Sequence, residues 1–182
     1  MDEAIIAIEC DEPKGKFLRS IYPMPLSRSN LLKFWEHSSK YPTIFNTEIR
    51  GDFQKFCELF IDEHNGELTG RGLFWRVDDF VGVVYMTNIQ PAHDALVHMS
   101  FFDGRLKGRQ PLMKAMLQYV FKKYMFRRLT AEVPEYVVPY TIDFVKALGF
   151  KFEGKKRRST PFDNKYFDTN IFGVLREELL NG

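Results

Sequence analysis

The stretch from residue 94 to residue 150 constrains the fold most, because β-rich and helical segments alternate along it. "DALVHMSFF" (94–102) and "RRLTAEVP" (127–134) have the β-branched and aromatic content of strands. Between them, "PLMKAMLQYVFKKYM" (111–125) has the three- and four-residue apolar spacing of an amphipathic helix. A strand, a helix and a second strand in this order predict two parallel neighbours in one sheet.

The segments on both sides extend this pattern. "GLFWRV" and "FVGVVYMTNI", joined by a short link, predict a β-hairpin, and "YTIDFVKALGF" predicts a short helix that ends at Gly149. We expect one domain over residues 1–182, an α/β fold with a mixed, partly parallel central sheet of six to seven strands flanked by about four helices. The other predicted elements are a strand at 16–24, a helix at 30–41 capped by Ser27 or Ser29, a helix at 52–64 that begins at Asp52, and strands at 150–158 and 166–175.

Composition argues against several classes of protein. The chain has 182 residues and is 45% apolar, which suits a globular core. No apolar run approaches the roughly 18 residues of a membrane span. The N-terminal "MDEAIIAIECDEPKGK" lacks the basic start and long apolar stretch of a secretory signal, so we expect a cytoplasmic protein. Two cysteines and four histidines form no metal-binding motif, so no metal is expected.

The charge pattern allows two interpretations. The net charge of +2 is too small to indicate nucleic-acid binding by itself. Basic residues nevertheless cluster in "RLKGR" (105–109), "KKYMFRR" (122–128) and "KKRR" (155–158). Such clusters are either solvated faces or sites that attract an anionic ligand.

The turn "FFDGRLKGRQPL" (101–112) has the physical properties of a phosphate site. A helix that begins directly after a strand presents unpaired N–H groups and the positive end of its dipole. Gly108 lets the backbone approach a ligand closely, and Arg105, Lys107 and Arg109 add positive charge. Pro111 suits the first helical turn. The turn matches neither the phosphate loop of nucleotide hydrolases nor the three-glycine dinucleotide fingerprint, so alone it fits a plain turn as well as a phosphate site.

Element order and turn together resemble the GCN5-related N-acetyltransferase (GNAT) superfamily, whose members transfer acetyl from acetyl-CoA to an amine. The loop signature of that family, Q/R-x-x-G-x-G/A between its fourth strand and third helix, corresponds here to Arg105–Gln110. The downstream "LGFKFEG" (148–154) is similar to the family's LGF-x-x-EG segment. The resemblance covers roughly residues 72–175, the expected cofactor-binding core, and leaves residues 17–70 as a variable acceptor-side part.

The resemblance implies acetyl-CoA as the cofactor and a cleft that holds it. The backbone from Lys107 to Gln110 would hold the pyrophosphate, while the strand segment "HMSF" would run beside the pantetheine arm. Thr141 keeps a hydroxyl where the family usually has Ser. The expected cofactor-binding residues are Met99, Phe101, Arg105, Lys107, Gly108, Arg109, Gln110 and Thr141.

Acetyl transfer needs a base for the attacking amine and can use an acid for the leaving thiolate. Members of the family often carry a Glu near the strand at 94–102 as base, and the nearest titratable residue here is His98. Asp94, at the start of the same strand, and Glu132, at the end of the next one, are further candidate bases, and Tyr140 is the candidate acid. Each of these side chains has a structural alternative, because polar groups in a sheet are usually satisfied by their neighbours.

Departures from the family pattern keep other functions open. Gln110 replaces a small residue of the loop, and Pro111 lacks an N–H. Val138 and Val145 stand where the family often has a cofactor-contacting Asn and a Tyr that acts as general acid. These features are typical of an acyltransferase-like domain that has lost catalysis and serves as a binding module. Nucleic-acid binding by the basic clusters is the third and least favoured hypothesis. The sequence specifies neither the amine acceptor (a protein N-terminus, a lysine or a small amine) nor the oligomeric state.

Overall fold

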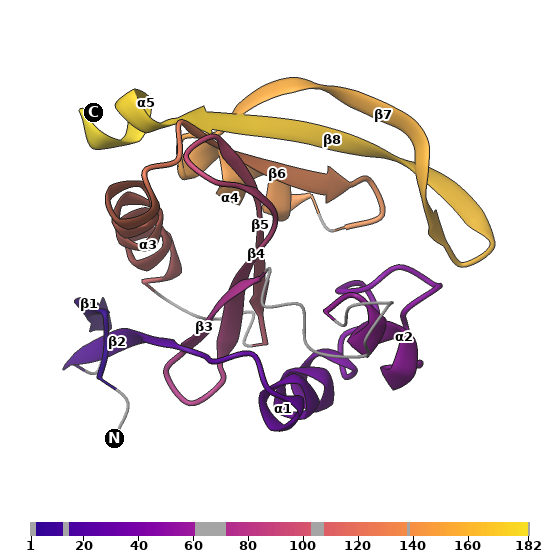
Figure 1. The fold of residues 1–182 in the computed structure, drawn as a ribbon, viewed down its shortest axis with the longest axis horizontal. Coiled ribbons are helices and arrows are strands. Elements are labelled where there is room, and N and C mark those ends of the chain that lie inside the picture. The colour runs from indigo at the N-terminus through magenta and orange to yellow at the C-terminus, as the bar shows by residue number, and fades with distance from the viewer. Residues whose placement is uncertain (1–2, 13–14, 61–71, 103–107, 138, 182) are drawn as a thin grey trace.

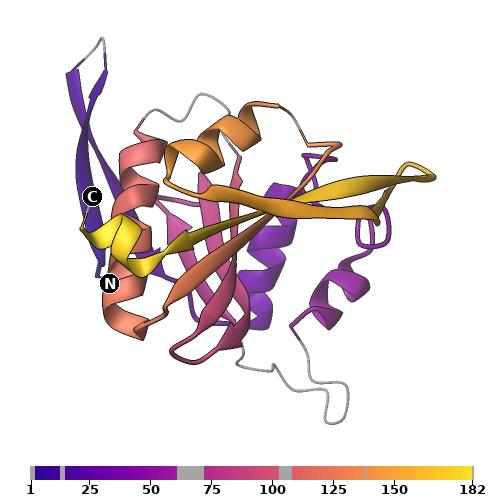
Figure 2. The same cartoon turned by 90° about the horizontal axis from the view of Figure 1, so that it is seen from above.

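The computed structural model describes residues 3–12, 15–60, 72–102, 108–137 and 139–181, which form one mixed sheet with helices on both faces (Figure 1, Figure 2). In these ranges eight strands lie in the order β1-β2-β3-β4-β5-β6-β8-β7. The strands are β1 (Ile6–Glu12), β2 (Gly15–Pro23), β3 (Leu73–Val77), β4 (Gly82–Gln90), β5 (Asp94–Phe101), β6 (Arg128–Pro134), β7 (Lys151–Phe162) and β8 (Lys165–Leu175). The helices are α1 (Arg28–Ser38), α2 (Phe53–Glu58), α3 (Arg109–Tyr124), α4 (Tyr140–Ala147) and α5 (Arg176–Leu180).

The expected mixed, partly parallel sheet is confirmed, and it has more strands than the six to seven predicted. The strand without a counterpart in the prediction is β1, which pairs antiparallel with β2. Its Ile6 and Ile8 pack against the core and alternate with exposed Ala7 and Glu9. This signal is short and surrounded by polar residues, so the sequence pattern alone does not single it out.

The helix boundaries follow local capping. Ser27 caps α1, since its Oγ accepts from the Asn30 N–H at 3.2 Å. Asp52 caps α2 in the same way through the Lys55 N–H. The predicted helix continued to residue 64, whereas α2 ends at Glu58, and residues 61–64 lie outside the described ranges. Among the helices described, none has the length and apolar character needed to cross a membrane.

β5 and β6 are the parallel neighbours, and every other adjacent pair of described strands is antiparallel. The crossover between β5 and β6 runs through α3. In the described part of the chain the two strands pair only at Leu96–Thr130. β5 continues to Phe101 and β6 to Pro134, so the strands separate toward their carboxyl ends and leave a gap in the sheet.

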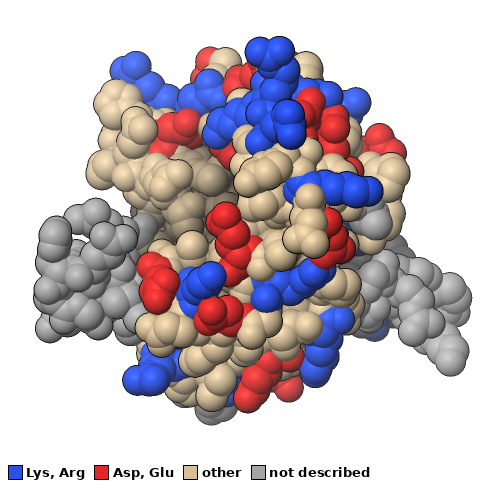
Figure 3. Space-filling model, turned by 90° about the vertical axis from the view of Figure 1, so that its right-hand side faces the viewer, with Lys and Arg blue, Asp and Glu red and all other residues tan. Residues whose placement is uncertain are grey.

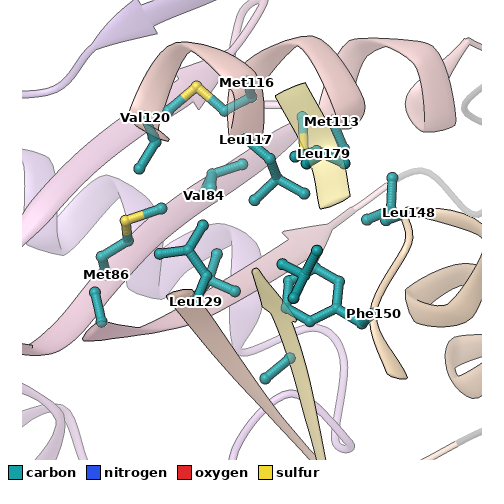
Figure 4. Close-up of a cluster of buried hydrophobic side chains, with 14 of the residues drawn as sticks. Val84, Met86, Met113, Met116, Leu117, Val120, Leu129, Leu148, Phe150 and Leu179 are labelled. Carbon is teal, nitrogen blue, oxygen red and sulfur yellow. The ribbon is translucent and has the colours of Figure 1, made fainter. Parts of the chain in front are cut away.

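Two hydrophobic clusters hold the helices to the two faces of the sheet. α1 and α2 pack Phe34 and Phe56 near Tyr85 of β4. Because successive strand residues point to opposite faces, β5 turns Val97 toward α3 and His98, the partner of Tyr85, toward α1 and α2. The α3 cluster includes Val84, Met86, Met113, Met116, Leu117, Val120, Leu129, Leu148, Phe150 and Leu179 (Figure 4).

β7 and β8 form a long hairpin that extends over the helices α1 and α2 (Figure 1). Near its turn, Asp163 forms an ion pair with Arg50 in the segment between α1 and α2. The Phe162 ring stacks on Tyr136 with ring centroids 4.1 Å apart and an interplanar angle of 10°. The hairpin turn is therefore fixed both to the segment between α1 and α2 and to the loop after β6.

Candidate functional site

A cavity of about 510 Å³ occupies the gap between β5 and β6. This is the size of a small-ligand site. Because the two strands no longer pair there, their backbone edges are available to a ligand. The walls are Leu96–Phe101 of β5, Ala131–Pro134 of β6, five residues of α4 and its end (Tyr140, Thr141, Phe144, Val145 and Leu148), and the segment around Thr43–Asn46 and Ile49.

The start of α3 forms one end of this cavity. The first helical bond runs from the Leu112 N–H to the Gly108 carbonyl at 3.1 Å, so the N–H groups of Gly108, Arg109 and Gln110 precede the intrahelical pattern. The Arg109 guanidinium lies over Phe144, 5.1 Å from its ring centroid. Arg109 lines both the cavity and a shallower hollow between α3 and α4. N–H groups without an intrahelical partner, the helix dipole and an arginine together suit a phosphate.

Gly108 and Gln110 each have a packing role in this turn. Gly108 has φ of +72°, and a Cβ built there would overlap the Sγ of buried Cys10 in β1. Gln110 Nε2 donates to the Ala147 carbonyl at 3.3 Å, which ties α3 to the end of α4. The side chain of Gln110 is thus directed at α4, and its departure from the family's small residue has a structural explanation. Arg105 and Lys107, two of the expected cofactor ligands, lie outside the described residues, as does Val138.

The cavity has two chemically different sides. Met99 and Phe101 belong to the α3 face of β5, where the Phe101 ring meets Phe144 edge-on at 5.9 Å. Thr141, in the first turn of α4, also lines the cavity. His98 belongs to the opposite face, the side of α1 and α2. A ligand held along β5 would therefore contact apolar side chains on one face and meet an imidazole on the other.

His98, one of the expected bases, lines the cavity from the middle of β5. Its ring stacks on Tyr85 with centroids 4.4 Å apart, and its Nε2 lies 2.9 Å from Thr87 Oγ1. Burial lowers the pKa of His98 from 6.5 to about 4, so the ring is neutral near pH 7. A neutral imidazole has one unprotonated nitrogen that can take a proton.

The other three candidate catalytic residues differ in their placement. Glu132 lines the cavity and forms an ion pair with Lys156 of β7. Asp94 does not line the cavity. Its carboxylate accepts from Thr130 Oγ1 and lies 3.5 Å from Arg128. Tyr140 lines the cavity at the exposed start of α4, below the Arg109 guanidinium.

Some cavity residues have no signal in the sequence. Tyr136 lines the cavity from the loop after β6 and is held there by the ring of Phe162. Thr160 and Thr169 line it from β7 and β8, with their hydroxyl oxygens 2.7 Å apart. These residues belong to segments distant in sequence from the turn before α3, so no local motif could have indicated them. Among the described residues, no group of three or more His, Cys, Asp or Glu side chains could hold a metal ion.

Comparison with known proteins supports the same fold. A family model described as an acetyltransferase (GNAT) domain matches residues 33–171. None of the curated proteins matches the sequence. The spermidine N-acetyltransferase from Vibrio cholerae, in complex with CoA and spermine, has a similar structure with a TM-score of 0.68 at 18% identity, covering 88% of this chain and 98% of that one.

Two further structures of the same kind are similar over nearly their whole length. The ribosomal-protein-S5-alanine acetyltransferase from Vibrio fischeri has a TM-score of 0.66 at 15% identity, covering 96% of this chain and 98% of that one. A dodecameric spermidine N-acetyltransferase from Vibrio cholerae has a TM-score of 0.65 at 17% identity, with 90% and 96% covered. At these identities the structures support the fold alone, whereas the family model covers most of the sequence. The chain belongs to the GNAT acetyltransferase family.

Proposed function

We propose that this protein is an N-acetyltransferase that moves the acetyl group of acetyl-CoA to an amine. The observation that carries the proposal is the cavity in the sheet, which has a helix N-terminus with Arg109 at one end and His98 and Glu132 on the opposite face. Acetyltransferases of this family use acetyl-CoA, which supplies an acetyl group activated as a thioester. The similar proteins, one in complex with spermine and one an acetyltransferase of a ribosomal protein, differ so much in their amines that they do not define the acceptor here.

The residues of the cavity fit acetyl-CoA. The N–H groups of Gly108–Gln110 and the guanidinium of Arg109 would bind the pyrophosphate. The unpaired edge of β5 between His98 and Phe101 would offer main-chain hydrogen bonds to the pantetheine amides, and Met99 and Phe101 would cover its apolar part. This arrangement holds the donor in one orientation, which is itself a large part of the rate acceleration of a two-substrate reaction.

The acceptor amine would approach from the side of α1 and α2. A base with a pKa of about 4 is weak toward a free ammonium ion, so His98 suits an amine that is already neutral and becomes acidic as the N–C bond forms. Glu132 would attract the ammonium form of the amine to the cavity once its ion pair with Lys156 has opened. Tyr140 lies beside Arg109, so in this arrangement it would be nearer the pyrophosphate than the leaving sulfur, and the thiolate would leave without a proton from it.

The proposal is tested by calorimetric titration of acetyl-CoA together with an assay of CoA release over a panel of amines. We expect Arg109→Gln to weaken acetyl-CoA binding about tenfold, the order expected from losing a charge-assisted contact to phosphate. Lys114→Gln is the matched control, because it removes a positive charge from the exposed side of the same helix. Absence of acetyl-CoA binding would contradict the proposal. Binding without transfer to any amine would instead identify a CoA-binding module.

A further inference from the structure

The edge strand β7 contains a bulge that presents two arginines. Between the pairs Lys156–Thr169 and Thr160–Phe167, residues 157–159 of β7 lie opposite the single residue Asp168 of β8. The Arg158 N–H donates to Asp168 Oδ1 at 2.8 Å, and Ser159 Oγ donates to Thr169 Oγ1 at 2.9 Å. The bulge is thus anchored to β8 by defined hydrogen bonds.

The positive charge of this bulge is not neutralised. Lys155 and Lys156 pair with Glu135 and Glu132. Arg157 and Arg158 are exposed and form no ion pair within the described part of the chain. Lys and Arg side chains gather at the top of the molecule, over the β7–β8 hairpin (Figure 3).

This basic bulge adjoins the acceptor side of the cavity. Ser159 bonds to Thr169, which lines the cavity together with Thr160. Lys156, at the start of the bulge, contacts Glu132 of the cavity wall. β7 is also the last strand of the described sheet, so apart from the Pro161 carbonyl, which accepts from the Thr47 N–H, its outer edge is open to an extended chain.

We propose that the acceptor is a polypeptide whose amine enters the cavity and whose acidic side chains bind Arg157 and Arg158. The inference rests on the proposed function and adds the class of substrate. A guanidinium matches a carboxylate with two parallel hydrogen bonds, and an extended peptide can follow the edge of β7 away from the cavity. Two uncompensated arginines suit a short acidic stretch better than nucleic acid, whose binding usually neutralises more phosphates.

The test compares two synthetic peptides that carry the same free N-terminus and one lysine. One has Asp and Glu at its third to sixth positions, and the other has Asn and Gln there. We expect kcat/KM to be about tenfold higher for the acidic peptide, and we expect Arg157→Gln with Arg158→Gln to remove this preference. The control double variant, Lys114→Gln with Lys122→Gln, removes two exposed charges from α3 and should keep the preference.

Each outcome has a distinct meaning. Equal kcat/KM for the two peptides in the unaltered protein would overturn the inference. Acetylation of small amines without acetylation of either peptide would overturn it too, while leaving the proposed function intact. Inhibition by a single-stranded oligonucleotide at lower concentration than by a non-acceptor acidic peptide would reassign the bulge to nucleic acid. Failure to bind acetyl-CoA would reject the proposed function and the inference together.

Discussion

At the scale of single residues, His98 is both packed into the protein interior and exposed to the cavity. Its ring is packed against Tyr85 and hydrogen-bonded to Thr87, yet it lines the cavity between β5 and β6. The same burial that positions the ring also disfavours its charged form. A histidine of this kind makes the stability of the protein depend on pH.

The pH dependence has a definite sign. The pKa of His98 falls from 6.5 to about 4 on folding, so between these pH values the unfolded chain binds a proton that the folded chain does not. The free energy of unfolding should therefore drop as the pH falls from 7 to 4, with His98 contributing about 3 kcal/mol. Urea unfolding at both pH values should show that His98→Gln loses less stability than the unaltered protein by about this amount. Equal losses would show that the ring titrates normally.

The turn before α3 has a partial signal in the sequence. Gly108 and Arg109 stand out because a strand, a glycine-containing turn and a helix follow one another in the chain. The packing of Gly108 on Cys10 was not predictable, since it depends on β1 lying against the start of α3. The role of Gln110 likewise depends on the end of α4 lying within reach of its side chain.

At the scale of elements, the prediction matched α3 over nearly its whole length, whereas the helix expected at 52–64 ends at Glu58 and neither β1 nor α5 was predicted. The helix α3 buries a continuous apolar stripe, so its apolar residues recur at helical spacing in the sequence. α5 has only five residues, and β1 alternates over few positions. Short elements like these are held by tertiary contacts, such as the burial of Leu179 from α5 in the α3 cluster.

The turn of the β7–β8 hairpin should govern acceptor binding without affecting the cofactor. Phe162 stacks on Tyr136, a cavity residue, and also lies under the Arg50 guanidinium. Phe162→Ala should release Tyr136 and raise the KM for the acceptor about tenfold, because an ordered aromatic contact at the cavity is lost. The Kd for acetyl-CoA, measured by calorimetry, should stay within about twofold, since Arg109 and the α3 turn are untouched.

A matched control lies on the same hairpin. Tyr166 is 63% exposed, so Tyr166→Ala removes an aromatic ring of similar size without altering the cavity wall. An equal rise in acceptor KM for both variants would mean that the effect comes from general loosening of the hairpin. An increase in the Kd for acetyl-CoA in Phe162→Ala would show that the hairpin turn supports the cofactor side as well.

At the scale of the whole molecule, the site arises from the way one sheet is divided. Strands β1 to β5 and strands β6 to β8 meet in the described structure at one parallel pair, Leu96–Thr130. The order of elements predicted the parallel contact, but the place where the strands separate depends on strand register. Register is set by packing on both faces of the sheet and by distant contacts such as Tyr136–Phe162. Sequence patterns could therefore indicate the turn before α3, but not the cavity residues Tyr136, Thr160 and Thr169.

Binding of acetyl-CoA should bridge the two parts of the sheet, which hydrogen exchange can measure. The pantetheine arm would pair with the open edge of β5, so amides at 97–101 and 131–133 should exchange about tenfold more slowly at saturation. ADP is the control ligand, because it has the pyrophosphate but no pantetheine. It should protect the start of α3 near Arg109 and leave β5 unchanged. Equal protection of β5 by ADP, or protection confined to α1 and α2, would contradict this arrangement of the ligand along the divided sheet.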